Sequence, residues 1–352
     1  MSATSSPGTP GWVKFSLQLD GAGGAVPFTL QERLPDTGSP VWVHLDYTFS
    51  EAREWLERQT AVPEAAVEAL LAQETRPRVS DVGGGLLVYL RGVNLYPDAR
   101  PEDMIAVRLW VKDRLVISTQ KRQLFTLTEI TEDLAKGQGP TSASQLLAWL
   151  VDGLIWRMEE VIERIEDLVG ECSDSLEHSP DRALTHAISS VRRRAIALRR
   201  YLAPQREAIT RLQTDTRLER HDSELIREAG DRLQRLVEDL DAARDQATLL
   251  QEEVFAIQNE AINDRMYLLA IISAIFLPLG FLTGLFGINI GGMPGVEDPH
   301  AFWWFVGFLV VISLGLLFWM IRRRWFGNRA SKAVRLGRLG ILPRTNWLLR
   351  KK

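Results

Sequence analysis

Two long uncharged segments near the C-terminus constrain the fold more than any other feature of this sequence. Residues 266–286 and 301–321 each contain twenty-one residues without Asp, Glu, Lys or Arg. A helix needs about twenty such residues to cross the roughly 30 Å hydrocarbon core of a membrane. The alternative is a pair of helices buried in the core of a soluble protein. We predict two transmembrane helices joined by an external loop at 287–300.

The charged residues around these segments predict their orientation. Residues 322–352 contain eleven Lys and Arg and no acid, while the loop carries only Glu297 and Asp298 as charges. Because basic residues accumulate on the cytoplasmic side of membrane helices, we place both termini in the cytoplasm. The remaining chain has 31 basic against 45 acidic residues. An acidic body with a basic cytoplasmic tail excludes nucleic acid as an expected partner.

The region before the first span is predicted to be a helical stalk, residues 142–265. Ser179-Pro180-Asp181 should break it, a second helix should run over 182–217, and a third should start near Ser223 as its cap. No breaker follows until Pro278, so the third helix should continue into the membrane. Its apolar residues follow a heptad pattern, which predicts a coiled coil or bundle. They are Ile226, Ala229, Leu233, Leu236, Leu240, Ala243, Ala247, Leu250, Val254, Ile257, Ala261, Leu268 and Ile271, with Asp264 as the one polar exception.

The opposite face of this helix carries small or weakly polar residues, even inside the membrane segment. They are Glu252, Ala256, Asn259, Asn263, Met266, Ala270, Ser273, Leu277, Gly280 and Gly284. In the cytosolic part this face could simply be solvated, and the glycines could serve close helix packing. Polar or small residues inside a membrane usually face protein or water. We therefore predict that this face lines a narrow aqueous path.

Residues 1–141 are predicted to form a cytoplasmic α/β domain. Strand patterns occur at 41–45, 86–90, 105–111 and 115–119, with helices at 51–58 (capped by Ser50) and from Pro63. Gly83-Gly84-Gly85 marks a hairpin turn and lacks the spacing of a phosphate-binding loop. Strands that alternate with helices indicate an α/β fold. The whole chain is therefore expected to be an α+β membrane protein whose long stalk helix continues into the first of two transmembrane helices.

The sequence contains no constellation typical of an enzyme. One cysteine, Cys172, excludes an intrachain disulfide and a thiolate metal cluster, and the five histidines have no zinc-ligand spacing. We find no nucleophile elbow, so we predict no catalytic residues and no cofactor. The competing class of function is a membrane-anchored coiled-coil protein that senses or relays a signal. Such an anchor needs neither a polar face within the membrane nor a special loop after it.

The end of the first span resembles a known signature. Residues 285–295 read Leu-Phe-Gly-Ile-Asn-Ile-Gly-Gly-Met-Pro-Gly, which is similar to the Gly-x-Asn motif of the CorA metal-ion transporter family. Ile288 at the middle position and the following Gly-Gly-x-Pro-Gly resemble the ZntB branch of that family. Residues 74–78 and 90–94 also resemble this branch, and residues 274–279 resemble the stretch that precedes the motif in the family. The resemblance covers most of the chain but not the extension beyond Asn328.

The resemblance implies a homopentameric funnel in a bacterial inner membrane. Gly287, Ile288 and Asn289 would form the outer mouth of a central pore, and Glu297 and Asp298 would lie in the acidic external loop. The residues implied along the pore agree with most of the face that we identified from periodicity. They are Asn259, Asn263, Met266, Leu269, Ser273 and Leu277.

The resemblance also implies the transported ion. In the ZntB branch this ion is zinc, with proton-coupled uptake favoured and efflux as the alternative. Conduction requires weak and repeated oxygen contacts rather than a tight tetrahedral site. The residues themselves do not distinguish zinc from magnesium, cobalt or nickel, and no residue is assigned as a tight metal ligand. The expected partners are further copies of the chain, the lipid bilayer, divalent cations and protons.

Overall fold

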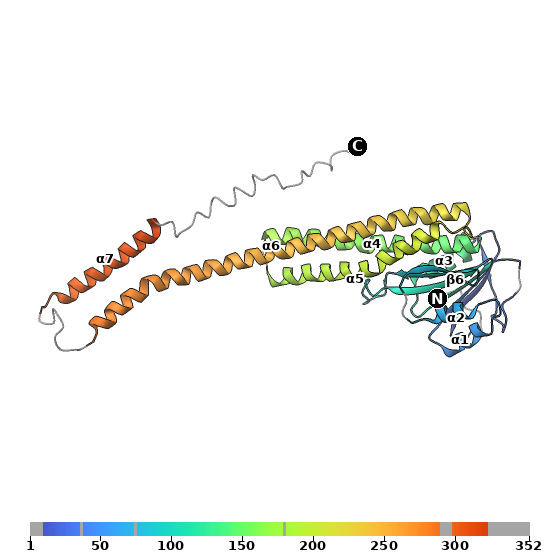
Figure 1. Ribbon diagram of the computed structural model, residues 1–352, viewed down its shortest axis with the longest axis horizontal. Coiled ribbons are helices and arrows are strands. Elements are labelled where there is room, and N and C mark those ends of the chain that lie inside the picture. Colours follow the sequence, from blue (N-terminus) through green and yellow to red (C-terminus); the bar gives the residue numbers. More distant parts are fainter. Residues whose placement is uncertain (1–9, 36–37, 74–75, 179–180, 289–297, 323–352) are drawn as a thin grey trace, which may run out of the picture. The chain divides into compact units, whose positions relative to one another are not determined.

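A computed structural model describes residues 10–35, 38–73, 76–178, 181–288 and 298–322. The chain divides into two compact units, residues 1–257 and residues 258–352. The first unit contains a β-sheet and a bundle of long helices, and the second contains the apolar helices (Figure 1). Each unit is described by itself.

The first unit is organised around one seven-stranded sheet. The strands are β1 (Val13–Leu19), β2 (Ala25–Pro27), β3 (Val41–Asp46), β4 (Arg78–Val82), β5 (Gly85–Gly92), β6 (Ile105–Lys112) and β7 (Leu115–Gln120). Their order across the sheet is β2-β1-β3-β7-β6-β5-β4, and only β3 and β7 pair in parallel. The four predicted strands are confirmed as β3, β5, β6 and β7. The sequence analysis did not assign β1, β2 or β4.

The predicted glycine turn is confirmed between β4 and β5. Gly83 has φ +62° and Gly84 has φ +75°, so both central residues of the hairpin lie in the left-handed region. A two-residue turn of this kind matches the twist of the flanking strands, and glycine adopts it without strain. A Cβ at Gly83 would also collide with the ring of Pro63, at the start of the neighbouring helix.

Helices cover both faces of the sheet. One face packs on α1 (Ser50–Glu57) and α2 (Glu64–Leu71) around Trp110, and the other packs on α3 (Phe125–Ala135) and the first half of α4 around Trp42. The predicted cap of α1 was wrong by one residue. Phe49 occupies the cap position without a side-chain bond, and the Ser50 hydroxyl donates to Glu51 instead.

His44 lies in the layer between the sheet and α3 and titrates far from its ordinary range. Its side chain is fully buried, its Nδ1 lies 2.7 Å from the hydroxyl of Ser118, and its ring stacks on Phe15. Burial disfavours the charged imidazolium and lowers the pKa of His44 to about 4. The folded protein therefore keeps His44 in its neutral form at pH 7.

We expect acid to weaken the first unit through His44. Because the folded pKa lies below the unfolded value, the stability is fully present above about pH 6.5 and is lost as the pH falls towards 4. The loss at pH 5 should be about 2 kcal/mol. Urea unfolding of the purified protein at pH 7 and pH 5 measures it. His44→Asn should show a smaller pH dependence, and equal dependence in both proteins would contradict this assignment.

Three long helices form the bundle of the first unit: α4 (Ala143–His178), α5 (Arg182–Gln213) and α6 (Arg220–Phe286). The predicted break after α4 is confirmed, with Asp181 accepting the backbone N–H of Leu184 as the N-cap of α5. Gln205 of α5 is buried and binds both the N–H and the carbonyl of Arg91 on β5. This side chain fixes the bundle to the sheet, because it binds the backbone N–H and carbonyl of Arg91, which β4 does not pair with.

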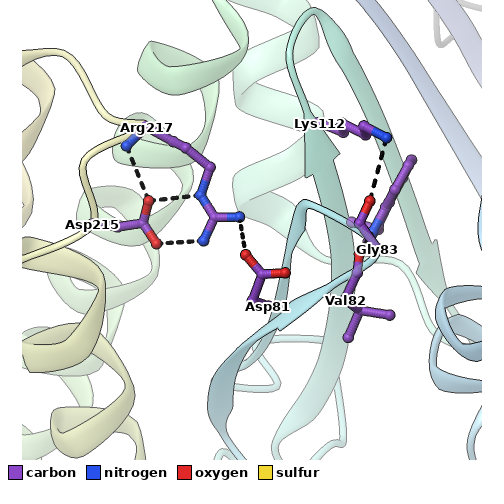
Figure 2. Close-up of polar contacts among 7 residues, drawn as sticks. Asp81, Val82, Gly83, Lys112, Asp215 and Arg217 are labelled. Atoms are coloured by element: carbon purple, nitrogen blue, oxygen red, sulfur yellow. Dashed lines mark hydrogen bonds and ion pairs between the residues drawn. The ribbon is translucent and has the colours of Figure 1, made fainter.

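The predicted boundaries between α5 and α6 were wrong. We expected α5 to reach Arg217 and α6 to start near Ser223, but a turn occupies residues 214–219. Asp215 accepts the backbone N–H of Arg217 and binds its guanidinium, which also reaches Asp81 on β4 at 2.6 Å (Figure 2). Asp competes with helix formation through such local bonds. The ion pair of Arg217 with Asp81 therefore fixes the turn to the sheet.

The apolar seam of α6 is buried along the bundle, and beyond it Ile271 is the one buried residue of the described seam. Its members from Ile226 to Val254 are buried in one core with α4 and α5, so the seam packs within one chain. Beyond that point Ile257, Ala261, Asp264 and Leu268 are exposed in the single chain. The bundle alternative of our prediction is observed for the first part, and a coiled coil between copies stays a prediction.

The second unit contains the C-terminal part of α6 and a further helix, α7 (Ala301–Arg322). The two helices contact each other through the rings of Phe286 and Phe305, whose centroids lie 4.9 Å apart. Both helices are long and apolar enough to cross a membrane, and their apolar stretches are not buried within the chain. α6 ends at Phe286, the predicted end of the first membrane segment, and α7 matches the predicted second segment at 301–321 to within one residue.

Candidate ion pathway on α6

The candidate pore residues lie on one exposed face of α6 in the second unit. At 100° per residue, Asn259, Asn263, Met266, Leu269, Ser273 and Leu277 project within one sector of the helix. All six are exposed, with 63 % exposure for Met266 and Leu269 and 77 % for Leu277. Ile271 on the opposite side is buried. This face has no cover within the chain, and the seam residues Ala261 and Leu268 are exposed as well.

Two glycines continue this face towards the C-terminal end of the helix. A Cβ atom built on Gly280 or Gly284 would meet no heavy atom within 4 Å. The glycines are therefore not needed for contact with α7. They leave a smooth helix surface that another helix or a column of water could approach.

The predicted mouth lies partly outside the described residues. α6 ends at Phe286, and the N–H of Gly287 binds the carbonyls of Thr283 and Gly284. A Cβ at Gly287 would lie 2.9 Å from the Thr283 oxygen, which favours glycine at this helix end. Ile288 follows as an exposed residue, whereas Asn289 and Glu297 are not among the described residues.

Asp298, the second acid of the predicted external loop, accepts hydrogen bonds at the start of α7. Its Oδ1 accepts the backbone N–H of His300 at 2.8 Å and lies 3.6 Å from the His300 Nδ1. Its carbonyl accepts the N–H of Ala301. The side chain stays half-exposed, so it can fix the helix start and still contribute negative charge to its surroundings.

The sequence analysis missed an acidic row on the part of α6 that belongs to the first unit. Counting back from Glu252 by four and three residues leads to a row of exposed carboxylates. Its members are Glu224, Glu228, Asp231, Glu238 and Asp245. Arg235 is the one base in this row. The signal was present in the sequence, because the spacing simply continues in the N-terminal direction.

The described residues contain no group of three His, Cys, Asp or Glu side chains placed to hold a metal ion. Cys172 is buried, and burial raises the pKa of its thiol, so it is held as a neutral thiol. The polar atoms that the α6 face offers in the second unit are amide and hydroxyl oxygens. Such neutral oxygens can replace water around a hydrated cation without trapping it.

Comparison with known proteins places the chain among metal-ion transporters. The profile of the family described as CorA-like Mg2+ transporter protein matches residues 37–323. The Zinc transport protein ZntB of Pectobacterium carotovorum is 36% identical over 312 residues, which cover 88% of this chain and 94% of that protein. The Divalent cation transporter CmaX of Pseudomonas aeruginosa is 38% identical over 291 residues, covering 81% and 86%. The structure of full-length CmaX superposes with a TM-score of 0.78 at 35% identity, covering 91% of this chain and 99% of that one.

Proposed function

The chain belongs to the CorA-like Mg2+ transporter protein family, and on that premise we propose that it carries divalent cations, zinc foremost, across the bacterial inner membrane. Members of this family are transporters and not enzymes. Zinc enters the proposal through the similarity to the Zinc transport protein ZntB. Coupling of zinc uptake to proton inflow is part of the proposal.

The observation that carries this proposal is the uncovered face of α6. This face exposes the polar side chains of Asn259, Asn263 and Ser273, together with the larger side chains of Met266 and Leu277. One such helix cannot enclose water within a membrane, where exposed polar groups are costly. We propose that five copies surround a central axis, so that this face lines a shared pore. Ions would then pass through successive rings of weak oxygen ligands.

Asn289 is the proposed selectivity residue at the outer mouth, next to Gly287 and Ile288. An amide offers one carbonyl acceptor and two N–H donors. Its carbonyl can bind water around a hydrated cation while its NH2 binds a neighbouring backbone. Five such carbonyls favour cations without the tight binding of a carboxylate ring.

Ion-by-ion flux in liposomes tests the assignment of zinc. Purified protein is reconstituted, and inflow of zinc, magnesium, cobalt and nickel is compared at equal concentration with dyes suited to each ion. We expect zinc to move fastest. Equal rates for all four ions would remove the zinc assignment and leave general divalent transport.

We expect the loop between the two spans to lie outside the cell. A cysteine placed at Val296 in a Cys172→Ala background should react with a membrane-impermeant maleimide added to intact cells. The reason is the basic segment that follows α7, which should remain in the cytoplasm. Labelling at Val296 only after the cells are permeabilised would invert the topology.

Neutralising the acidic loop should lower cation flux mainly at low salt. Five copies would place ten carboxylates of Glu297 and Asp298 around one opening, and such a field concentrates cations. Mobile ions screen it over about 10 Å at 0.1 M salt. Glu297→Gln combined with Asp298→Asn should therefore reduce zinc flux in dilute buffer and much less at 0.5 M salt. A reduction of the same size at both salt concentrations would argue against electrostatic concentration.

A further inference from the structure

The outer helices of the bundle carry opposite charges on two defined surfaces. We define the acidic flank as Trp156, Glu159, Glu163 and Glu166 of α4, which follow one another at spacings of three and four. We define the basic flank as Arg193, Ile196, Arg200 and Ala203 of α5, with the same spacing. Residues three and four apart share one side of a helix, so each flank is a continuous surface.

Each flank exposes one large apolar side chain among its charges. Trp156 is 58% exposed and Ile196 is 49% exposed. Trp is among the residues that most often anchor interfaces. Both flanks therefore have the composition of a contact surface, with an apolar anchor among charges.

The charges of the acidic flank are not balanced within the chain. Among the described residues, Glu159, Glu163 and Glu166 make no ion pair, and Arg193 of the basic flank makes none either. Burial raises the pKa of Glu166, and the neighbouring carboxylates of Asp239, Glu163 and Asp167 raise it further. Crowded carboxylates repel one another, so a cationic surface placed here would relieve that repulsion.

Both flanks lie on the side of their helix that borders α6. Asp152, two turns before Glu159, is paired with Arg232 of α6 at 3.2 Å. Arg199, one turn before Ala203, is paired with Asp241 of α6 at 2.5 Å, and Arg192, one turn before Ile196, binds Gln251 of α6. On α6 the exposed acidic row lies between Arg232, which contacts α4, and Asp241, which contacts α5, so the row lies between the two flanks. If this row faces the axis of a ring, the flanks face the two neighbouring copies.

The two flanks also lie at matching heights along the bundle. Helix α4 ends at His178, α5 begins at Arg182, and the two helices pack against each other. Glu166 lies twelve residues before the end of α4 and Arg193 eleven residues after the start of α5. The same count pairs Glu159 with Arg200 and Trp156 with Ala203. Rotation about an axis parallel to the bundle preserves height, so these pairs would face each other between copies.

We propose that the acidic flank of α4 in one copy docks on the basic flank of α5 in the next copy, as a head-to-tail contact that closes the cytoplasmic ring. Glu166 would pair with Arg193, and Glu159 with Arg200. Trp156 would pack on Ala203 and on the adjoining helix surface. A head-to-tail contact uses two different surfaces, which is what the opposite charges provide. This inference rests on the ring assembly of the proposed function.

Disulfide crosslinking between two differently tagged chains tests the contact. In a Cys172→Ala background, one full-length chain carries Glu163→Cys and the other Ile196→Cys, which leaves both charge pairs intact. Oxidation of membranes from co-expressing cells should give a disulfide-linked dimer that contains both tags. Each variant expressed alone should give none. A dimer of two Glu163→Cys chains, or no mixed dimer, would overturn the proposal.

Charge exchange in this crosslinking background tests the pairing itself. Glu166→Arg should reduce the mixed dimer about tenfold, as expected for the loss of one favourable pair and the gain of a like-charge contact. Adding Arg193→Glu should restore it. Glu171→Arg, on the α5 side of α4, is the matched control and should change nothing. Equal crosslinking in all variants would overturn the pairing.

The oligomeric state of the wild-type protein separates this contact from the ring itself. A wild-type oligomer without mixed crosslinks would reject this contact alone, whereas a wild-type monomer would reject the ring as well.

Discussion

Asn289→Ala should reduce zinc flux at least about tenfold while the oligomer assembles at near-normal yield. Alanine removes the carbonyl that we assign to the pore mouth, so a cation would lose five weak ligands at once. The helix end should survive, because Gly287 already closes α6 through bonds to Thr283 and Gly284. Flux in liposomes and particle mass in mild detergent measure the two effects separately.

A structural role for Asn289 predicts a different pattern. Asn is common at helix ends, where it can cap the last turn. In that case Asn289→Ala would lower assembly or thermal stability, and flux per assembled particle would stay unchanged. Asn289→Asp is a useful companion variant, because a carboxylate ring should hold zinc more tightly and slow its release. Normal flux through a correctly assembled Asn289→Ala protein would place the selectivity site elsewhere.

Leu277→Ser should raise zinc flux several-fold. Leu277 is 77 % exposed, more than Met266 or Leu269, and lies on the same face as Ser273. Five leucine side chains at one level would form an apolar constriction, and water leaves such constrictions readily. Serine is smaller and polar, so the ring should become wider and wetter. Initial rates of dye quenching in liposomes provide the measurement.

Leu268→Ser is the matched control for this prediction. It makes the same change on the opposite face of α6, where Leu268 belongs to the apolar seam and is also exposed in the single chain. Its substitution should not raise flux, although it can weaken contacts between copies. A rise of equal size in both variants would indicate a general leak and would contradict the constriction at Leu277.

The long helices were predictable because their signals are local and repeated. The seam of α6 recurs over many turns, and the two uncharged segments are unambiguous in length. The boundaries near residues 214–219 were missed, because the hydrogen bonds of Asp215 with Arg217 replace the last helical turns. Arg217 also pairs with Asp81, which is far away in the sequence, and helical periodicity cannot predict that contact.

The sheet was predicted only in its central part. The patterns of β3, β5, β6 and β7 are compact apolar runs, whereas β4 reads Arg-Val-Ser-Asp-Val and lies at the edge of the sheet. An edge strand buries one face at most, so its composition resembles that of a loop. The single parallel pair, β3 with β7, joins segments about seventy residues apart and could not be read from local patterns.

The candidate pathway was predictable as a helix face but not as a pore. Spacing alone placed Asn259, Asn263 and Ser273 on one side of α6, and these side chains are exposed. In our proposal other copies of the chain cover them, and the periodicity of one chain says nothing about such copies. Asn289 depended on the resemblance of its motif, since one Asn after a helix is common in proteins of every class.

Zinc inflow into liposomes that contain the purified protein tests the central claim most directly. The liposomes enclose a zinc-sensitive dye, and inflow is measured with and without an inward proton gradient against protein-free liposomes. The account predicts zinc inflow well above the protein-free rate, with faster inflow when the outside is acidic. Inflow no faster than in protein-free liposomes, from a protein shown to be assembled and inserted, would contradict it and favour a membrane-anchored sensor.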